Sequence, residues 1–225
     1  MKVIEPYVRV EMFDGVKIMK NIEKACRTCY RSEDKISEDS YKKLLANCIS
    51  RGHESVMEHE KITVQLVCDI GVYKDLTRHR AGTAFSIEST RYCSYNKDKF
   101  GNEIKFIRPC HINGKLYDFW KESCGQIETQ YIQMAQAGAK PDQLRMILPH
   151  STAALVTMTC NIREWRHIFS LRAQKMTHPT VQQVMIPLLR YFQKEMPDLF
   201  GDIPYNAEFN EQDYAKIIIE KETYN

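Results

Sequence analysis

The chain has 225 residues, and 43% of them are hydrophobic and 27% are charged, which is ordinary for a soluble globular protein. The formal net charge of +3 is too small to indicate a nucleic-acid-binding protein. No apolar run approaches the roughly 20 residues that a membrane-spanning helix needs, and the N-terminus lacks the apolar core of a signal peptide. We therefore expect one cytoplasmic domain over residues 1–225, with neither a nucleic acid nor a membrane as partner.

The N-terminal half combines strand and helix patterns. Residues 61–70 alternate apolar and polar side chains almost strictly, which is the clearest strand pattern in the chain. The Asp14-Gly15 pair is a turn signal. In chain order we expect a strand and turn over 8–18, helices over 21–31 and 37–50, a strand over 61–70 and a short helix over 72–80.

The C-terminal half has the longest helical patterns. Asn161 and Glu164 have the spacing of a helix N-cap and its third residue, and Pro141 suits a first helical turn. The expected elements are a loop over 81–99, a strand over 103–108, a helix over 116–137, a helix from Pro141 to 149, a strand over 151–159, and helices over 161–172 and 179–196, the last ended by Pro197. This mixture predicts an α+β fold with a central antiparallel-type sheet and flanking helices.

Eight cysteines occur in a chain without a secretion signal, so we expect reduced thiols. Cys26 and Cys29 form a lone Cys-x-x-Cys without the second pair that a structural zinc site needs. His53 and His59 are six residues apart and do not share a helical face, which excludes a metalloprotease motif. We expect no metal site.

Arg78, His79 and Arg80 form a basic cluster, and the segment after it contains Ser89 and Arg91. Paired guanidinium groups bind phosphate through bidentate hydrogen bonds. The pattern therefore indicates a pocket for a phosphorylated small molecule. The alternative is a solvated basic helix end that complements the helix dipole.

Two further segments add to this cluster. Ser55 and Glu58 have the spacing of a helix capping box, within Arg-Gly-His-Glu-Ser-Val-Met-Glu-His. Arg163 and His167 are four residues apart and share a helical face, whereas Arg172 lies on a different face.

Four motifs between residues 51 and 172 together resemble the flavin-dependent thymidylate synthase family. The family has Arg-His-Arg followed by Ser-x-Arg-Tyr, and here eight residues separate Arg80 from Ser89. It also has Gly-His-Glu-Ser/Thr-x-x-Glu-His, Ala-Arg-x-x-Leu-Pro, and Asn-x-Arg followed by Asn or His and then Leu-Arg. The matching segments here begin at Gly52, Leu144 and Asn161.

The resemblance implies two groups of site residues. The flavin-binding positions are Ser55, Glu58, Arg78, His79, Arg80, Asn161, Arg163 and His167. The substrate-binding positions are Asp75, Arg78, Ile87, Glu88, Ser89, Thr90, Arg91, Arg145 and Arg172, and Arg172 is the expected catalytic residue. Some positions depart from the family: Asp75 replaces a Gln, Leu144 replaces an Ala, and Ile87 stands where Glu or Gln is common. These changes bear on the pyrimidine contacts more than on the reaction class.

The implied reaction is the reductive methylation of dUMP to dTMP. Methylenetetrahydrofolate supplies the carbon, FAD mediates the redox chemistry, and NADPH reduces the flavin. Arg172 is expected to favour N3-deprotonated uracil, while Arg91 and Arg145 hold the phosphate. Cys93 is the obvious candidate thiol, but the family works without an enzyme nucleophile, so it receives no role. The family assembles as a homotetramer, with each site built from several subunits.

Two alternatives remain open at this point. The first is a flavin enzyme that modifies another pyrimidine nucleotide, an option that Asp75 raises. The second is a non-enzymatic nucleotide- or RNA-binding module, in which the arginines bind phosphates and Tyr92, Tyr95 and Phe100 stack on bases. Flavin absorbance of the purified protein distinguishes the enzymes from the binding module.

Overall fold

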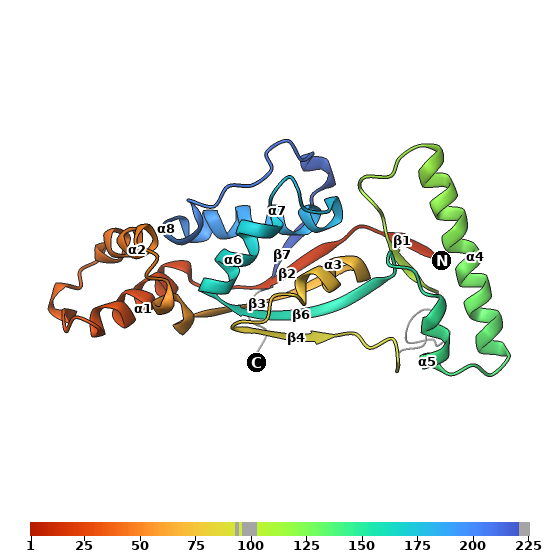
Figure 1. The fold of residues 1–225 in the computed structure, drawn as a ribbon, viewed down its shortest axis with the longest axis horizontal. Coiled ribbons are helices and arrows are strands. Elements are labelled where there is room, and N and C mark those ends of the chain that lie inside the picture. The colour runs from red at the N-terminus through yellow and green to blue at the C-terminus, as the bar shows by residue number, and fades with distance from the viewer. Residues whose placement is uncertain (93–94, 96–102, 221–225) are drawn as a thin grey trace.

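A five-stranded sheet forms the centre of the protein. The computed structural model describes residues 1–92, 95 and 103–220, and Figure 1 shows their arrangement. The strand order is β4-β6-β3-β2-β7, and only the β2–β7 pair is parallel among these neighbours. The strands are β2 (Tyr7–Glu11), β3 (Lys61–Asp69), β4 (Thr83–Ile87), β6 (Ala153–Asn161) and β7 (Lys216–Glu220). The α+β class with a mostly antiparallel central sheet is therefore confirmed.

The main core lies on one face of this sheet. In β3, Ile62, Val64 and Leu66 are buried in the main core. Between them, Thr63 bonds Thr159 of β6 at 2.8 Å on the opposite face. At the end of β3, Val67 on that opposite face packs in a smaller cluster with Ile107 and Ala153. Because side chains alternate along a strand, the larger core lies on the Ile62 face. Three helices lie over it in Figure 1: α3 (Ile70–Leu76), α6 (Ile162–Arg172) and α7 (Pro179–Glu195).

The remaining elements lie beyond the two ends of the central sheet (Figure 1). One end has α1, α2 and η2, and the other has α4, α5 and a two-stranded parallel pair, β1 with β5. Their bounds are α1 (Gly15–Thr28), α2 (Ser40–Ser50), η2 (Ser55–His59), α4 (Lys115–Gln136), α5 (Pro141–Leu144), β1 (Lys2–Ile4) and β5 (Lys105–Ile107). The short elements η1 (Glu33–Lys35), η4 (Arg145–Ile147), α8 (Pro197–Phe200) and η5 (Glu211–Asp213) connect them.

Several predicted boundaries were wrong. Asp14-Gly15 does not form a turn after a strand: the Asp14 carboxylate accepts a 2.9 Å bond from the Lys17 N–H and begins α1. Helix α3 ends at Leu76, so the Arg-His-Arg cluster follows the helix instead of lying on it. Pro197 starts α8 as well as following α7, because proline suits a first helical turn.

The expected loop over 81–99 contains a strand that the sequence analysis missed. β4 pairs with β6 from Thr83 to Ile87 and forms an edge of the sheet. The segment alternates Ala and Ser with Phe and Ile, which is a strand pattern, but it is short and lies inside a polar motif. β4 matters for function because it separates the Arg-His-Arg cluster from the segment around Ser89.

Candidate active site

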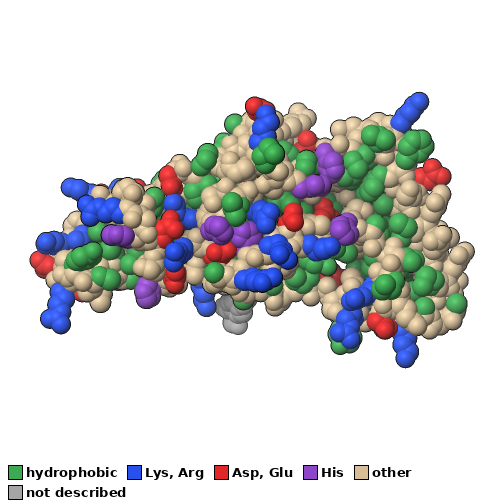
Figure 2. All heavy atoms as spheres, viewed as in Figure 1, with side chains coloured by type: hydrophobic (Ala, Val, Ile, Leu, Met, Phe, Trp, Pro, Cys, Tyr) green, Lys and Arg blue, Asp and Glu red, His purple; other side chains and the backbone are tan. Residues whose placement is uncertain are grey.

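His79 lies just beyond α3, and the fold turns its side chain inward. Asp69 begins α3 by accepting a 2.7 Å hydrogen bond from the backbone N–H of Val72. Beyond the helix, Arg78 and Arg80 are exposed, whereas His79 between them is only 5% exposed. The motif thus presents two guanidinium groups to solvent and buries one imidazole. Figure 2 shows basic and histidine side chains gathered on this face of the molecule, over α3 and α6.

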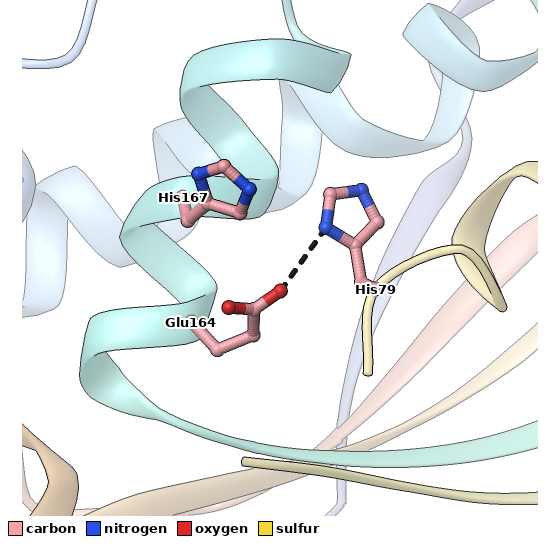
Figure 3. Close-up of side chains that lie close together, drawn as sticks. All are labelled: His79, Glu164 and His167. Carbon is pink, nitrogen blue, oxygen red and sulfur yellow. Dashed lines mark hydrogen bonds and ion pairs between the residues drawn. The ribbon is translucent and has the colours of Figure 1, made fainter. Parts of the chain in front are cut away.

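Three side chains meet around this imidazole, and together with it they form what we call the His79 cluster: His79, Glu164, His167 and Arg172. His79 Nδ1 lies 3.1 Å from Glu164 Oε1. A dashed line marks this contact in Figure 3. The His79 ring makes a T-shaped contact with His167, with ring centroids 5.5 Å apart. Arg172 Nε donates a 3.1 Å hydrogen bond to His79 Nε2. Arg172 was expected on another helical face from His167, yet its long side chain reaches the same imidazole.

These hydrogen bonds fix the proton of His79. An arginine N–H can only donate, so His79 Nε2 accepts and the ring proton sits on Nδ1. Nδ1–H in turn donates to Glu164. Burial, followed by the nearby Arg172 and His167, lowers the pKa of His79 to about 4. The ring is therefore neutral near pH 7, and its contact with Glu164 is a hydrogen bond and not an ion pair.

Arg172 uses one edge of its guanidinium for the protein. Nε donates to His79, and Nη2 donates a 3.1 Å bond to the backbone carbonyl of Asp75. These two N–H groups lie on the same side of the planar group. The outer edge, formed by Nη1 and the second N–H of Nη2, makes no hydrogen bond within the described residues. A half-buried fork of this kind suits a planar pair of acceptors.

Three members of the cluster could also be considered as metal ligands. The ligand atoms of His79, Glu164 and His167 all lie within 4.8 Å of one another. Both ring nitrogens of His79 are already hydrogen-bonded, however, and one of them accepts from Arg172. A metal ion would have to displace these bonds beside a fixed guanidinium charge. We therefore interpret the cluster as a hydrogen-bonded chain.

Asn161 joins β6 to α6 and fixes the start of the helix that carries Glu164. Its Oδ1 accepts a 2.8 Å bond from the Glu164 N–H, which confirms the predicted N-cap. Its own N–H donates to the Gly82 carbonyl at 3.1 Å. Gly82 has a φ of +62°, and a Cβ there would lie 2.1 Å from Asn161 Nδ2. The turn after Arg80 therefore requires glycine and packs directly on the start of α6.

Two other predicted flavin positions contact each other. Glu58 Oε1 accepts a 2.6 Å hydrogen bond from Arg163 Nη1. Both residues are exposed, as is Ser55 at the start of η2. The predicted Ser55–Glu58 capping box does not form, because η2 has no side-chain cap and Glu58 pairs with Arg163 instead. The fold thus brings η2, the segment after α3 and the start of α6 together.

The 88–91 segment follows the end of β4 that is farther from the His79 cluster. Thr83 at the start of β4 pairs with Cys160, whereas Ile87 at its end pairs with Val156. At roughly 3.3 Å per residue, the two ends of β4 are about 13 Å apart. Within one chain, the segment from Glu88 to Arg91 is therefore separated from the His79 cluster.

Within this segment, Glu88 is fixed and Arg91 is free to bind. The Glu88 N–H donates a 2.8 Å bond to the Leu155 carbonyl. The Arg91 side chain is exposed, with its guanidinium 5.6 Å from the centroid of the Tyr92 ring. Ile87, Glu88, Ser89 and Thr90 are all half-buried.

Arg145 and a cavity lie beside α3. Arg145 is exposed at the start of η4, and its charge opposes the rise that burial causes in the pKa of Tyr73 in α3. A cavity of about 400 Å³ opens next to Asp75. Its ionisable lining residues are Asp69, Lys74, Asp75, His111, His150 and His178. Asp75 therefore borders the cavity and also holds Arg172 through its carbonyl.

Glu164 is the site residue that the sequence analysis missed. It was interpreted only as the third residue of a helix start, but its carboxylate bonds His79 and does not complete a capping box. Its spacing from His167, three residues along one helix, is the signal that could have indicated a shared site. Cys93 and Phe100 lie outside the described residues.

A comparison with models of protein families identifies the family of the chain. A family model described as "Thymidylate synthase complementing protein" matches residues 16–198, more than half of the chain. The chain belongs to the flavin-dependent thymidylate synthase family. It is thus a member of an enzyme family, and every element of the His79 cluster lies within the matched range.

Relatives in this family are distant in sequence. The flavin-dependent thymidylate synthase of Pyrococcus abyssi is 29% identical over 166 residues, covering 72% of this chain and 67% of that protein. The Geobacter sulfurreducens protein of the same name is 24% identical over 186 residues, covering 79% and 78%. A "probable flavin-dependent thymidylate synthase" of Mycobacterium phage D29 is 27% identical over 196 residues, covering 81% and 82%.

A solved structure shares the fold. The UMP/dUMP methylase PolB from Streptomyces cacaoi, bound with 5-Br dUMP, superimposes with a TM-score of 0.74 at 20% sequence identity. The superposition covers 89% of this chain and 96% of that one. In the described part of this chain, none of the helices has the length and apolar character needed to cross a bilayer.

Proposed function

We propose that this protein catalyses the reductive methylation of dUMP to dTMP, with 5,10-methylenetetrahydrofolate as carbon donor and NADPH as reductant. The observation that carries the proposal is the hydrogen bonding of the Arg172 guanidinium. His79 and Asp75 fix one edge of its guanidinium, and the outer edge has no partner among the described residues. In the sequence resemblance described above, Leu171-Arg172 matches the Leu-Arg motif of the family, and the chain belongs to that family.

The outer edge of Arg172 can activate uracil. Carbon C5 of uracil is a weak nucleophile, and loss of the N3 proton raises its electron density. The deprotonated ring offers N3 and a neighbouring carbonyl oxygen as two acceptors in one plane, which match the guanidinium fork. Neutral uracil presents an N–H donor there instead. Arg172 therefore favours the anion electrostatically, and it does not act as a base, because arginine keeps its proton at neutral pH.

The residues near the His79 cluster fit FAD. Its pyrophosphate needs cationic donors, and Arg78 and Arg80 are both exposed. Neither guanidinium has a hydrogen bond or ion pair to another described residue. We propose that Arg78 and Arg80 bind the phosphates, with Ser55, Glu58, His79, Asn161, Arg163 and His167 as the further contacts. When bound, the flavin supplies the two-electron reduction that the methyl group requires.

Two buried thiols of the central sheet, Cys68 and Cys160, are unsuited to nucleophilic attack. Burial raises the pKa of Cys160, which adjoins Asn161, to about 12. Burial also raises the pKa of Cys68. A protonated, buried thiol is a poor nucleophile. We therefore propose that neither of these two thiols adds to C6 of the pyrimidine, and that activation depends on Arg172.

The substrate residues support an oligomeric site. Asp75, Arg145 and Arg172 lie around α3, while Arg91 lies beyond the far end of β4, about 13 Å of strand away. Within one chain, the length of β4 therefore separates Arg91 from the His79 cluster that contains Arg172. We propose that the 88–91 segment of a second copy completes the site, within the homotetramer that the family resemblance implied. Arg91 and Arg145 then bind the phosphate, with Ser89 beside it.

A different pyrimidine nucleotide is the second candidate substrate. Asp75 replaces the family's usual Gln and borders the 400 Å³ cavity. A carboxylate at this position can accept hydrogen bonds from sugar hydroxyls, and such an acceptor favours a ribonucleotide as well as a deoxyribonucleotide. The fold neighbour from Streptomyces cacaoi is itself described as a methylase of both UMP and dUMP.

Product analysis tests the proposed function. The purified protein, loaded with FAD, is incubated with methylenetetrahydrofolate, NADPH and one of dUMP, UMP or dCMP, and nucleotides are identified by mass spectrometry. We expect dTMP from dUMP. Methylation of UMP or dCMP without dTMP formation would show that the methylated nucleotide, and not dUMP, is the substrate. A protein that takes up no flavin and binds RNA would support the binding-module alternative instead.

A further inference from the structure

We propose that Glu164 is a positioning residue for the reaction. Its carboxylate holds His79 in the Nδ1–H tautomer, and the free Nε2 lone pair then orients Arg172 toward the pyrimidine. The inference rests on the proposed function, because it concerns the same arginine. The inference adds Glu164 to the residues proposed for the reaction. Glu164 acts through His79 and does not itself contact the nucleotide.

The position of Glu164 is strongly constrained. It is 7% exposed, and its backbone N–H is bonded to Asn161 at the start of α6. Its side chain therefore leaves a fixed point on the helix. Burying a carboxylate is costly unless it is hydrogen-bonded. Among the described residues, the 3.1 Å contact with His79 is the hydrogen bond that its carboxylate makes.

The tautomer of His79 decides what Arg172 can do. With the proton on Nδ1, Nε2 accepts the Arg172 N–H at 3.1 Å. With the proton on Nε2, two N–H groups would face each other at that distance. Arg172 would then leave His79, and its bond to the Asp75 carbonyl would be strained or lost. A carboxylate on the Nδ1 side prevents this outcome, because it can only accept.

The tautomer can be measured in the wild-type protein. Solid-state NMR of protein labelled with ¹⁵N in its histidine rings distinguishes protonated from unprotonated ring nitrogens. The His79 signals are assigned by their disappearance in His79→Gln. We expect a protonated Nδ1 and an unprotonated Nε2 near neutral pH. A wild-type His79 with its proton on Nε2, or on both nitrogens, would overturn the proposal.

The Glu164→Gln variant tests the consequence for turnover. Glutamine keeps the shape but can present either an oxygen or an N–H to Nδ1, so His79 should become a mixture of tautomers. Loss of a fixed Arg172 should lower kcat by up to about 100-fold, since small misplacements of a catalytic group cost that much. KM for dUMP should change little, because the phosphate contacts remain.

Glu23→Gln is the matched control. Glu23 is also a buried helical glutamate, 1% exposed, and it bonds Arg27 and Ser40 in the α1–α2 region, away from the site. We expect it to lower thermal stability without changing kcat or the His79 tautomer. If Glu164→Gln keeps the wild-type kcat, or lowers it with the tautomer unchanged, Glu164 has no positioning role.

The two proposals fail differently. Absence of dTMP formation by the wild-type protein contradicts the proposed function, while the NMR measurement still decides the tautomer. Normal dTMP formation by both the wild type and Glu164→Gln contradicts the positioning role alone.

Discussion

Arg172 Nε donates a 3.1 Å hydrogen bond to His79 Nε2, although the two residues are 93 positions apart in the sequence. This bond joins the Arg-His-Arg motif after α3 to the Leu-Arg motif at the end of α6. It also leaves the outer edge of the guanidinium available to a substrate. The two motifs are therefore parts of one hydrogen-bonded group, and a substitution in either should affect the other.

Arg172→Lys should lower turnover strongly. Lysine keeps the charge but cannot bond His79, the Asp75 carbonyl and a pyrimidine through one planar group. Losing a preorganised contact to a developing anion typically costs about 100- to 1000-fold in kcat. Flavin reduction by NADPH should stay largely intact. Normal turnover at saturating dUMP, measured by dTMP formation, would rule out the ring-activation role.

Arg91→Ala should mainly weaken dUMP binding. A phosphate contact is present in the ground state and the transition state alike, so KM should rise more than kcat falls. Arg190→Ala is the control, because Arg190 is an exposed arginine whose partner is Glu211. Calorimetric titration with dUMP measures the effect. Unchanged dUMP affinity in Arg91→Ala would place the phosphate elsewhere.

Mixing Arg91→Ala with Arg172→Lys should restore activity at dUMP concentrations well below the KM of Arg91→Ala, if sites are shared between copies. Arg91→Ala removes the phosphate contact of one subunit's segment, and Arg172→Lys removes the ring contact of another. Mixed assemblies would contain some sites with both residues intact. We expect a tetramer by mass measurement, and activity in the mixture well above either variant alone. A monomer with full activity, or no recovery after subunit exchange, contradicts a shared site.

Gly82→Ala should destabilise the site more than an ordinary glycine substitution. At φ +62°, an added Cβ would lie 2.1 Å from Asn161 Nδ2. The backbone strain alone costs roughly 1–2 kcal/mol, and displacement of Asn161 adds to it. The control is Gly114→Ala, where φ is +58° but no described heavy atom lies within 4 Å of the added Cβ. Urea unfolding and flavin affinity should both separate the two variants, and equal losses would contradict the packing argument.

His79 should make stability depend on pH. Its pKa falls from the ordinary 6.5 to about 4 in the folded protein, through burial and then Arg172 and His167. Between these values the unfolded chain binds more protons, so the free energy of unfolding rises with pH. The contribution of His79 to the free energy of unfolding is fully present above pH 6.5 and is lost as the pH falls toward 4. Over this pH range the free energy of unfolding changes by on the order of 3 kcal/mol.

Unfolding of the wild type and His79→Gln between about pH 5.5 and 7 measures this contribution. The variant should show a shallower pH dependence. His111, whose pKa burial also lowers, contributes in the same direction and stays in both proteins. Parallel pH curves for the two proteins would show that His79 does not titrate as described.

The fold was largely predictable where one local pattern dominated. The alternation over β3 and the helical spacing over α4, α6 and α7 predicted elements that the structure contains. Helix starts were less predictable, because Asp-Gly is both a turn signal and a helix N-cap. Strands β1 and β7 were missed, since short edge pairings depend on partners that are distant in sequence.

The candidate site was predictable in its residue types but not in its arrangement. The family resemblance implied His79, His167 and Arg172 as site residues, and the structure brings them together. The part played by Glu164 depends on the direction of one side chain, which a helix-start pattern does not determine. The separation of Arg91 from Arg172 depends on the β4–β6 register, which no local pattern contains.

Isotope transfer into the product tests the central claim most directly. The wild-type protein, with FAD and NADPH, is given dUMP and methylenetetrahydrofolate labelled with deuterium on its methylene carbon. We predict dTMP whose C5 methyl group carries both of these deuterium atoms, with the third hydrogen delivered by the reduction. Oxidation of NADPH without labelled dTMP would contradict the account.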